Sequence, residues 1–225
     1  MKAVIFDLFE TLITEWGQYK YTNREVAADL GIELYDFRSE SARLQKSRYA
    51  GGILDTAEFY KIMLERLGLN VDESLIQMVA AKRESSKKKC FETIDPAVLT
   101  LIQALKQSGY KIGLISNCSA EEIIGLKDCA LFGYLDAVVL SCDVGLIKPD
   151  AEIYEYCASL LQENAADCFF VGDGGSDELN GAKNAGMTPL RALWFVKHFV
   201  KNLDSFQAYP TFMDAGDLRE FLCGK

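Results

Sequence analysis

Residues 3–12 read AVIFDLFETL, an apolar run that ends in the acid Asp7. Four consecutive apolar residues, Ala3 to Phe6, are typical of a strand that is buried on both faces of a parallel sheet. Such a strand would carry the Asp7 carboxylate at its C-terminal end. Asp7 and Glu10 interrupt the apolar stretch, so we do not expect a signal peptide.

Further short apolar runs follow along the chain, at 111–115, 136–140, 168–172 and 190–194. Helical spacing of apolar residues separates several of them, as in 95–108 and 151–162. This alternation predicts an α/β fold with a Rossmann-like, doubly wound parallel sheet of five strands.

One long stretch breaks the alternation. Helical windows without a convincing strand fill it, at 23–30, 36–49, 55–67 and 72–89. We therefore predict a core of residues 1–14 and 93–225, with residues 15–92 inserted as a helical cap. The run Lys87-Lys88-Lys89 is interpreted as the solvated end of a helix.

Composition excludes several functional classes. The 225-residue chain has a formal charge of −9, which disfavours binding to nucleic acid or to anionic lipid. No apolar run reaches the ~18 residues that a membrane span needs. The chain contains seven cysteines, none in a Cys-x-x-Cys pair, so we expect free thiols and a cytoplasmic protein. The chain has a single histidine, His198, which excludes most Ser-His-Asp and Cys-His arrangements.

Polar side chains gather where the predicted strands end. Asp7 follows the first strand, Ser116-Asn117 the second, and Asp173 with Asp177 the fourth, while Lys148 lies in a loop after the third. Ligands bind at this edge of open α/β sheets. Each segment alone is a weak signal, but together they form a constellation of carboxylates, a hydroxyl and a lysine.

The order and spacing of these four segments resemble the haloacid dehalogenase-like hydrolase superfamily over the whole chain. The helical insert after the first segment is similar to the subgroup with 2-haloacid dehalogenases, phosphoglycolate and sugar-phosphate phosphatases, and phosphonoacetaldehyde hydrolase. This resemblance implies that Asp7 is a nucleophile that forms a covalent aspartyl intermediate. It also implies that Lys148 neutralises charge shared by Asp7 and the substrate.

The resemblance further implies a Mg²⁺ site and a phosphoryl-binding site. Asp7, Asp173, Asp177 and the backbone carbonyl of Phe9 would hold Mg²⁺. Thr11, Ser116 and the backbone N–H of Asn117 would donate hydrogen bonds to the transferring group. The expected substrate is a small phosphorylated metabolite, and the expected assembly is a monomer or a homodimer.

Phe9 is the main departure from the family pattern. Phosphatases of the family usually carry an Asp there, which protonates the leaving group, and a phenyl ring cannot do this. A Mg²⁺-dependent phosphatase whose leaving group needs little protonation is the favoured reading. Glu10 is a substitute acid only if its side chain reaches the site. A 2-haloacid dehalogenase, a phosphonatase and a protein that binds a phosphorylated ligand with little turnover remain alternatives.

The predicted cap would set specificity by closing over the core. Candidates for facing the site are Arg43, Arg48, Tyr49 and the turn Gly51-Gly52, with Trp16 near its mouth.

Overall fold

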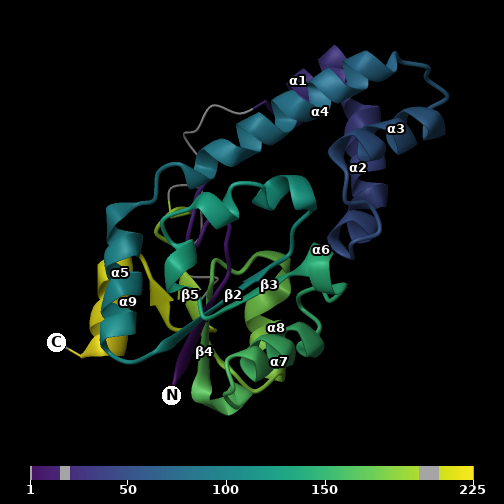
Figure 1. Cartoon of the computed structure of the whole chain (residues 1–225). Helices are drawn as coiled ribbons and strands as arrows, with labels where there is room; N and C mark the ends of the chain where they lie inside the picture. Colours follow the sequence, from purple (N-terminus) through teal and green to yellow (C-terminus); the bar gives the residue numbers. More distant parts are fainter. Residues whose placement is uncertain (1, 16–20, 198–207, 225) are drawn as a thin grey trace.

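The computed structural model describes residues 2–15, 21–197 and 208–224. Within these ranges its centre is a six-stranded sheet in the order β3-β2-β1-β4-β5-β6, with every neighbouring pair parallel (Figure 1). The strands are β1 (Ala3–Phe6), β2 (Lys111–Ser116), β3 (Ala137–Leu140), β4 (Cys168–Gly172), β5 (Thr188–Ala192) and β6 (Thr211–Phe212). The predicted α/β fold with a parallel, doubly wound sheet is confirmed.

The predicted count of five strands is wrong at one edge of the sheet. β6 contains only Thr211 and Phe212, which pair with Arg191 and Ala192 of β5. Two residues give no apolar run, so only the pairing defines this strand. β5 also begins and ends two residues earlier than predicted.

The central position of β1 brings the predicted site residues to one edge. Phe6 is in register with Leu114 of β2 and with Val171 of β4. The Asp7 N–H then donates to the Val171 carbonyl at 2.8 Å, which extends the ladder by one residue. Asp7 therefore leaves the sheet beside the ends of both neighbouring strands.

Helices cover both faces of the sheet. Helices α5 (Pro96–Gln107) and α9 (Ala215–Cys223) lie on one face, and α7 (Ala151–Leu160) and α8 (Glu178–Asn184) on the other (Figure 1). Val4 and Phe6 belong to the apolar cluster of the first face, whereas Ala3 and Ile5 belong to that of the second. Successive residues of a strand point to opposite faces, so β1 is apolar throughout.

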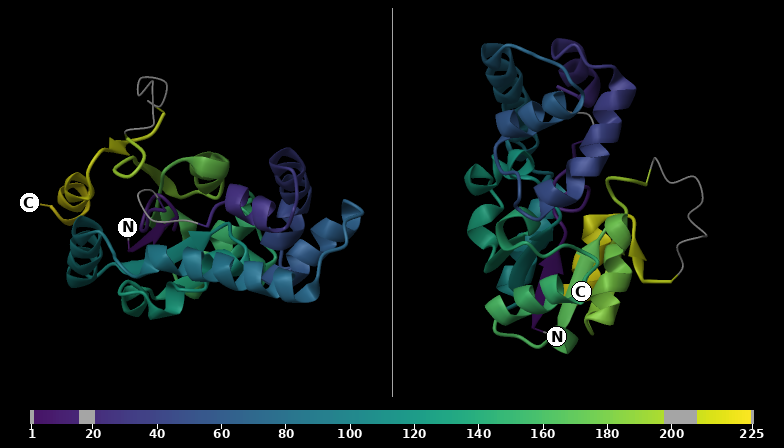
Figure 2. Two further views of the ribbon diagram at one scale, coloured as in Figure 1. Left: turned by 90° about the horizontal axis from the view of Figure 1, so that it is seen from above. Right: turned by 90° about the vertical axis from the view of Figure 1, so that its right-hand side faces the viewer.

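The inserted helices are α1 (Asn23–Asp29), α2 (Leu34–Tyr49), α3 (Thr56–Arg66) and α4 (Glu73–Lys88), close to the four predicted windows. They lie beyond the C-terminal edge of the sheet (Figures 1 and 2). Their apolar side chains form a separate buried cluster that includes Phe37, Tyr60 and Met63. That residues 15–92 act as one cap domain stays a prediction.

The remaining helices are short. They are α6 (Ser141–Val144) and the 3₁₀ turns Lys89–Phe91, Ala120–Ile123, Leu126–Asp128, Phe132–Tyr134, Ala165–Asp167 and Gly175–Asp177. All seven cysteines are free thiols, as expected. In the described ranges, no helix combines the length and the apolar character needed to cross a bilayer. Trp16 and His198 lie outside the described residues.

Candidate active site

A buried lysine joins two carboxylates at the C-terminal edge of the sheet. The Lys148 Nζ lies 2.5 Å from Asp7 Oδ1 and 2.5 Å from Glu178 Oε2. The lysine and Glu178 are almost inaccessible to solvent. Burial disfavours the charged ammonium, but the Asp7 and Glu178 carboxylates outweigh it and raise the pKa of Lys148 above its ordinary value. The lysine is therefore a permanent positive charge in this site.

The backbone around Lys148 is fixed by Asn117. The Asn117 Nδ2 donates to the Lys148 carbonyl, and the Lys148 N–H donates to Asn117 Oδ1, both at 2.8 Å. The Asn117 side chain thus positions the lysine loop against the end of β2. The predicted contact of the Asn117 backbone N–H with substrate stays a prediction.

Three carboxylates converge beside this lysine. Asp7, Asp173 and Glu178 each offer an oxygen, and these oxygens all lie within 4.8 Å of one another. Burial, and secondly the Asp7 charge, raise the pKa of Glu178 to about 8, while Lys148 opposes the shift. Burial likewise raises the pKa of Asp173. Lys148 and the buried Arg191, which acts on Asp173, are the positive charges near these three acids. Crowded carboxylate oxygens of this kind fit a hard divalent cation such as Mg²⁺.

A glycine makes room for this cluster. A Cβ on Gly172 would lie 2.1 Å from Glu178 Oε1 and 2.7 Å from its carboxyl carbon. The last residue of β4 must therefore lack a side chain for Glu178 to reach Lys148. The missing side chain at Gly172 thus allows the Glu178 carboxylate to join the acidic cluster.

The structure does not bring Asp177 into this group. Asp177 is exposed, and its carboxylate accepts a hydrogen bond from Asn180 Nδ2 at 2.6 Å. Ser176 and Asp177 both have a left-handed backbone, with φ of 52° and 55°. These two residues turn the chain so that Glu178, one position later, faces Asp7. Sequence spacing missed Glu178 because this local backbone conformation has no clear sequence signal.

Two fully buried hydroxyl groups lack partners. Neither Thr11 Oγ1 nor Ser116 Oγ has a hydrogen bond to any residue in the described part of the chain. The Thr11 backbone is held in place, because the Trp194 indole N–H donates to its carbonyl at 2.9 Å. Buried hydroxyls normally find partners, whereas these two, in the loop after β1 and at the end of β2, find none among the described residues.

A cavity of about 290 Å³ opens above Asp7 and Lys148. Phe9 and Glu10 line it together with Asp7, Lys148, Asp173 and Glu178. Glu10 has a φ of 57°, so the backbone is not extended there and the side chain reaches the cavity wall. Its carboxylate accepts hydrogen bonds from the Thr14 hydroxyl at 2.6 Å and from the Glu15 N–H at 3.0 Å.

The inserted helices contribute unequally to the site. Tyr49 lines the cavity above Asp7, as expected, whereas Arg48 points to Ser119 and Glu121 of the core at 3.0 and 3.1 Å. Arg43 is largely exposed and pairs with Glu40, outside the cavity. Gly51 packs so closely on the Cys142 carbonyl that a Cβ would lie 2.3 Å from its oxygen.

The prediction for Lys87 is wrong. Its side chain is buried between the inserted helices and the core, and its ammonium lies 2.8 Å from Glu15 and 3.3 Å from Glu122. Lys88 does match the prediction of a solvated helix end, because it forms an exposed ion pair with Asp128. A run of lysines at a helix end does not reveal which of them meets a carboxylate from a distant loop.

Comparison with known proteins places this geometry in a family. A family model described as haloacid dehalogenase-like hydrolase matches residues 1–186. The pyrophosphatase PpaX of Bacillus mycoides is 26% identical over 201 residues, which cover 88% of this chain and 86% of that protein. PpaX of Bacillus cereus is 28% identical, with 88% and 85% covered.

Solved structures share the fold at low sequence identity. A 2-haloacid dehalogenase from Pseudomonas syringae has a TM-score of 0.72 at 21% identity and covers 99% of this chain and 98% of its own. A haloacid dehalogenase family enzyme from Bacteroides thetaiotaomicron, in complex with magnesium and inorganic phosphate, has a TM-score of 0.65 at 18% identity, with 85% and 94% covered. The family match spans most of the sequence, and the chain therefore belongs to the haloacid dehalogenase-like hydrolases.

Proposed function

We propose that this hydrolase is a Mg²⁺-dependent phosphatase that acts on a small phosphorylated metabolite through an aspartyl phosphate on Asp7. The observation that carries the proposal is the buried cluster of Asp7, Asp173, Glu178 and Lys148. Asp7, Asp173, Glu178 and the Phe9 carbonyl would hold Mg²⁺. When bound, the ion would offset the repulsion between these carboxylates and an anionic substrate.

The protein's own residues would then act in two steps. A carboxylate oxygen of Asp7 bonds to phosphorus while the bond to the leaving oxygen breaks, and that oxygen keeps the electron pair. Water next attacks the phosphorus, which releases inorganic phosphate and a proton and restores Asp7. Thr11 and Ser116 donate hydrogen bonds to the phosphoryl oxygens, and Lys148 offsets the charge that develops there.

Phe9 narrows the proposed substrate to compounds with a weakly basic leaving group. No proton donor stands at this position, and the Glu10 carboxylate, although it lines the cavity, is engaged by the Thr14 hydroxyl and the Glu15 N–H. A phosphoanhydride or an acyl phosphate therefore suits the site better than an alkyl ester. The relatives named pyrophosphatase support this choice, because inorganic phosphate is a weakly basic leaving group.

The proposal predicts a strong dependence on the leaving group. In the presence of Mg²⁺, kcat/KM for pyrophosphate, acetyl phosphate and p-nitrophenyl phosphate should exceed that for glycerol phosphate by at least about 100-fold. Phosphate release with and without Mg²⁺ measures this directly. Similar rates on alkyl and activated substrates would show that another group protonates the leaving oxygen.

An aromatic residue at position 9 also favours a second candidate, 2-haloacid dehalogenation. Halide leaves without a proton, so Phe9 is no obstacle to that reaction. Metal-independent chloride release from 2-chloropropionate, without phosphate release from the panel above, would establish this activity. No release of either ion would favour a protein that only binds a phosphorylated ligand.

The two neighbouring acids after β4 offer a matched test of the metal site. Glu178→Gln should weaken Mg²⁺ binding at least about tenfold, because it removes one of three clustered carboxylates. Asp177→Asn should leave Mg²⁺ affinity unchanged, since this carboxylate lies outside the cluster. Calorimetric titration of both variants with Mg²⁺ gives the two affinities. If Asp177→Asn weakened Mg²⁺ binding and Glu178→Gln did not, Asp177 would be the metal ligand instead of Glu178.

A further inference from the structure

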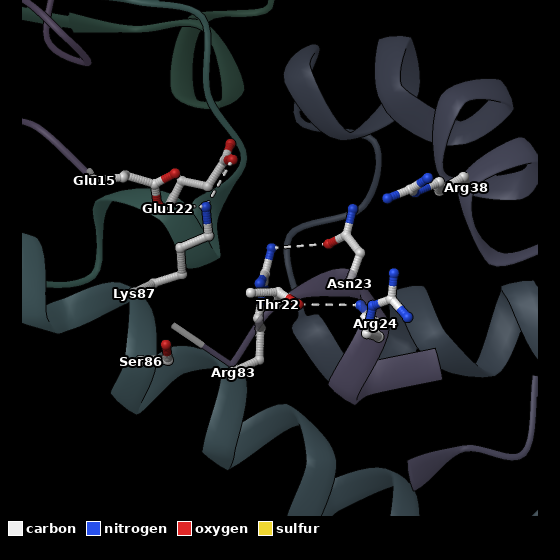
Figure 3. Close-up of a pocket in the computed structure, with 9 residues that line it drawn as sticks. All are labelled: Glu15, Thr22, Asn23, Arg24, Arg38, Arg83, Ser86, Lys87 and Glu122. Atoms are coloured by element: carbon white, nitrogen blue, oxygen red, sulfur yellow. Dashed lines mark hydrogen bonds and ion pairs between the residues drawn. The ribbon is translucent and has the colours of Figure 1, made fainter. Parts of the chain in front are cut away.

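A second cavity, of about 450 Å³, lies between the inserted helices and the core (Figure 3). Arg24 and Arg38 come from α1 and α2, and Arg83 and Lys87 from α4. Glu15 and Glu122 line its core side. Four cations facing one space in a chain of net charge −9 are a marked local concentration of positive charge.

Two of these cations are held by protein groups. The Arg83 guanidinium donates to Asn23 Oδ1 at 3.3 Å and lies 3.4 Å from Glu121. Lys87 bridges Glu15 and Glu122, as described above. These contacts balance the acids on the core side of the cavity.

The other two cations, Arg24 and Arg38, have no such partners among the described residues. Neither guanidinium forms an ion pair or hydrogen bond with any residue in the ranges 2–15, 21–197 and 208–224. Figure 3 shows the two side chains extending from separate helices toward the same space. Glu25, next to Arg24 in sequence, accepts hydrogen bonds from the Thr22 hydroxyl and backbone N–H. Both arginines are exposed residues that line the same cavity, and guanidinium groups in such a position favour an anion in that space.

The cavity adjoins the one above Asp7. Glu15 and Glu122 line both spaces, so the two cavities share a wall. We propose that Arg24 and Arg38 bind the distal anionic group, a phosphate or a carboxylate, of an elongated substrate whose reacting phosphoryl group lies at Asp7. The identity of that reacting group rests on the proposed function, whereas the anion site stands on the arginines themselves.

Binding of inorganic tripolyphosphate tests the anion site without turnover. Calorimetric titration into Asp7→Asn protein should show at least about tenfold weaker binding when Arg24→Gln and Arg38→Gln are added, because two charge-assisted contacts are lost. Lys46→Gln removes a charge from the same helix as Arg38 but lies outside the cavity, and it should not change the affinity. Equal affinities in all three proteins would overturn the proposal.

Kinetics with Asp7 intact distinguish a distal group of the substrate from a separate anion that binds independently of the substrate. The double arginine variant should hydrolyse p-nitrophenyl phosphate normally, because this short substrate has no distal anion. Competitive inhibition by tripolyphosphate that weakens in this variant supports a distal substrate group. Noncompetitive inhibition would overturn that assignment, because tripolyphosphate would then bind at a site separate from the substrate site. If p-nitrophenyl phosphate is not hydrolysed at all, the proposed function fails, while the titration still reports on the arginines.

Discussion

Asp7→Asn is expected to reduce Mg²⁺-dependent phosphate release at least about 10³-fold. The amide has nearly the same shape as the carboxylate but lacks its negative charge and is a poor nucleophile toward phosphorus. It cannot form the covalent intermediate, and it also removes one of the clustered oxygens proposed to hold the metal. Phosphate release under single-turnover conditions, at saturating Mg²⁺ and substrate, measures the loss.

The same variant should fold normally. Lys148 keeps Glu178 as an ion partner at 2.5 Å, and the Asp7 N–H still completes the ladder to Val171. Its thermal unfolding temperature should therefore stay near that of the wild type. Asp177→Asn, a nearby exposed change, is the matched control and should retain full activity. If Asp7→Asn kept more than about a tenth of the wild-type kcat, the nucleophile would be another group.

Much of the core fold could be predicted because burial on both faces leaves a plain sequence signal. The first four strands are largely apolar, and β1 has Val4 and Phe6 on one face and Ala3 and Ile5 on the other. The inserted helices were equally visible from their spacing. β6 was not, since a two-residue edge strand is defined by its partner and not by its composition.

The site could be predicted where a strand end determines the position of a side chain. Asp7 and Asp173 follow buried strands directly, and the register of β1 with β4 brings them together. Glu178 depends instead on two successive left-handed residues, and a sequence gives little warning of these. Arg24 and Arg38 meet only because two helices pack in a particular way, so their shared cavity could not be inferred from spacing.

Lys148→Met is expected to destabilise the metal-free protein by about 3–5 kcal/mol. The substitution preserves much of the side-chain volume but leaves Asp7 and Glu178, which lie close to Asp173, without the ammonium that they share. Urea unfolding monitored by circular dichroism measures this loss. Added Mg²⁺ should recover part of the lost stability, because the cation supplies positive charge to the same carboxylates.

The pH dependence of this destabilisation has a defined sign. The pKa of Glu178 is already raised to about 8 from an ordinary value of 4.5, and loss of the ammonium raises it further. A carboxyl whose pKa is raised in the folded state contributes stability below the unfolded pKa and loses it as the pH rises through the folded value. The variant should therefore lose more stability, relative to the wild type, at pH 9 than at pH 6.

Lys106→Met is the matched control, because its ammonium forms a partly exposed pair with Asp136 at 2.7 Å. Loss of such a pair should cost less than about 1 kcal/mol, with no dependence on Mg²⁺. If the two variants were equally stable at every pH and Mg²⁺ concentration, Lys148 would not be balancing buried charge. The acidic cluster would then have to be largely protonated in the folded protein, and the case for a resident cation would lose its electrostatic basis.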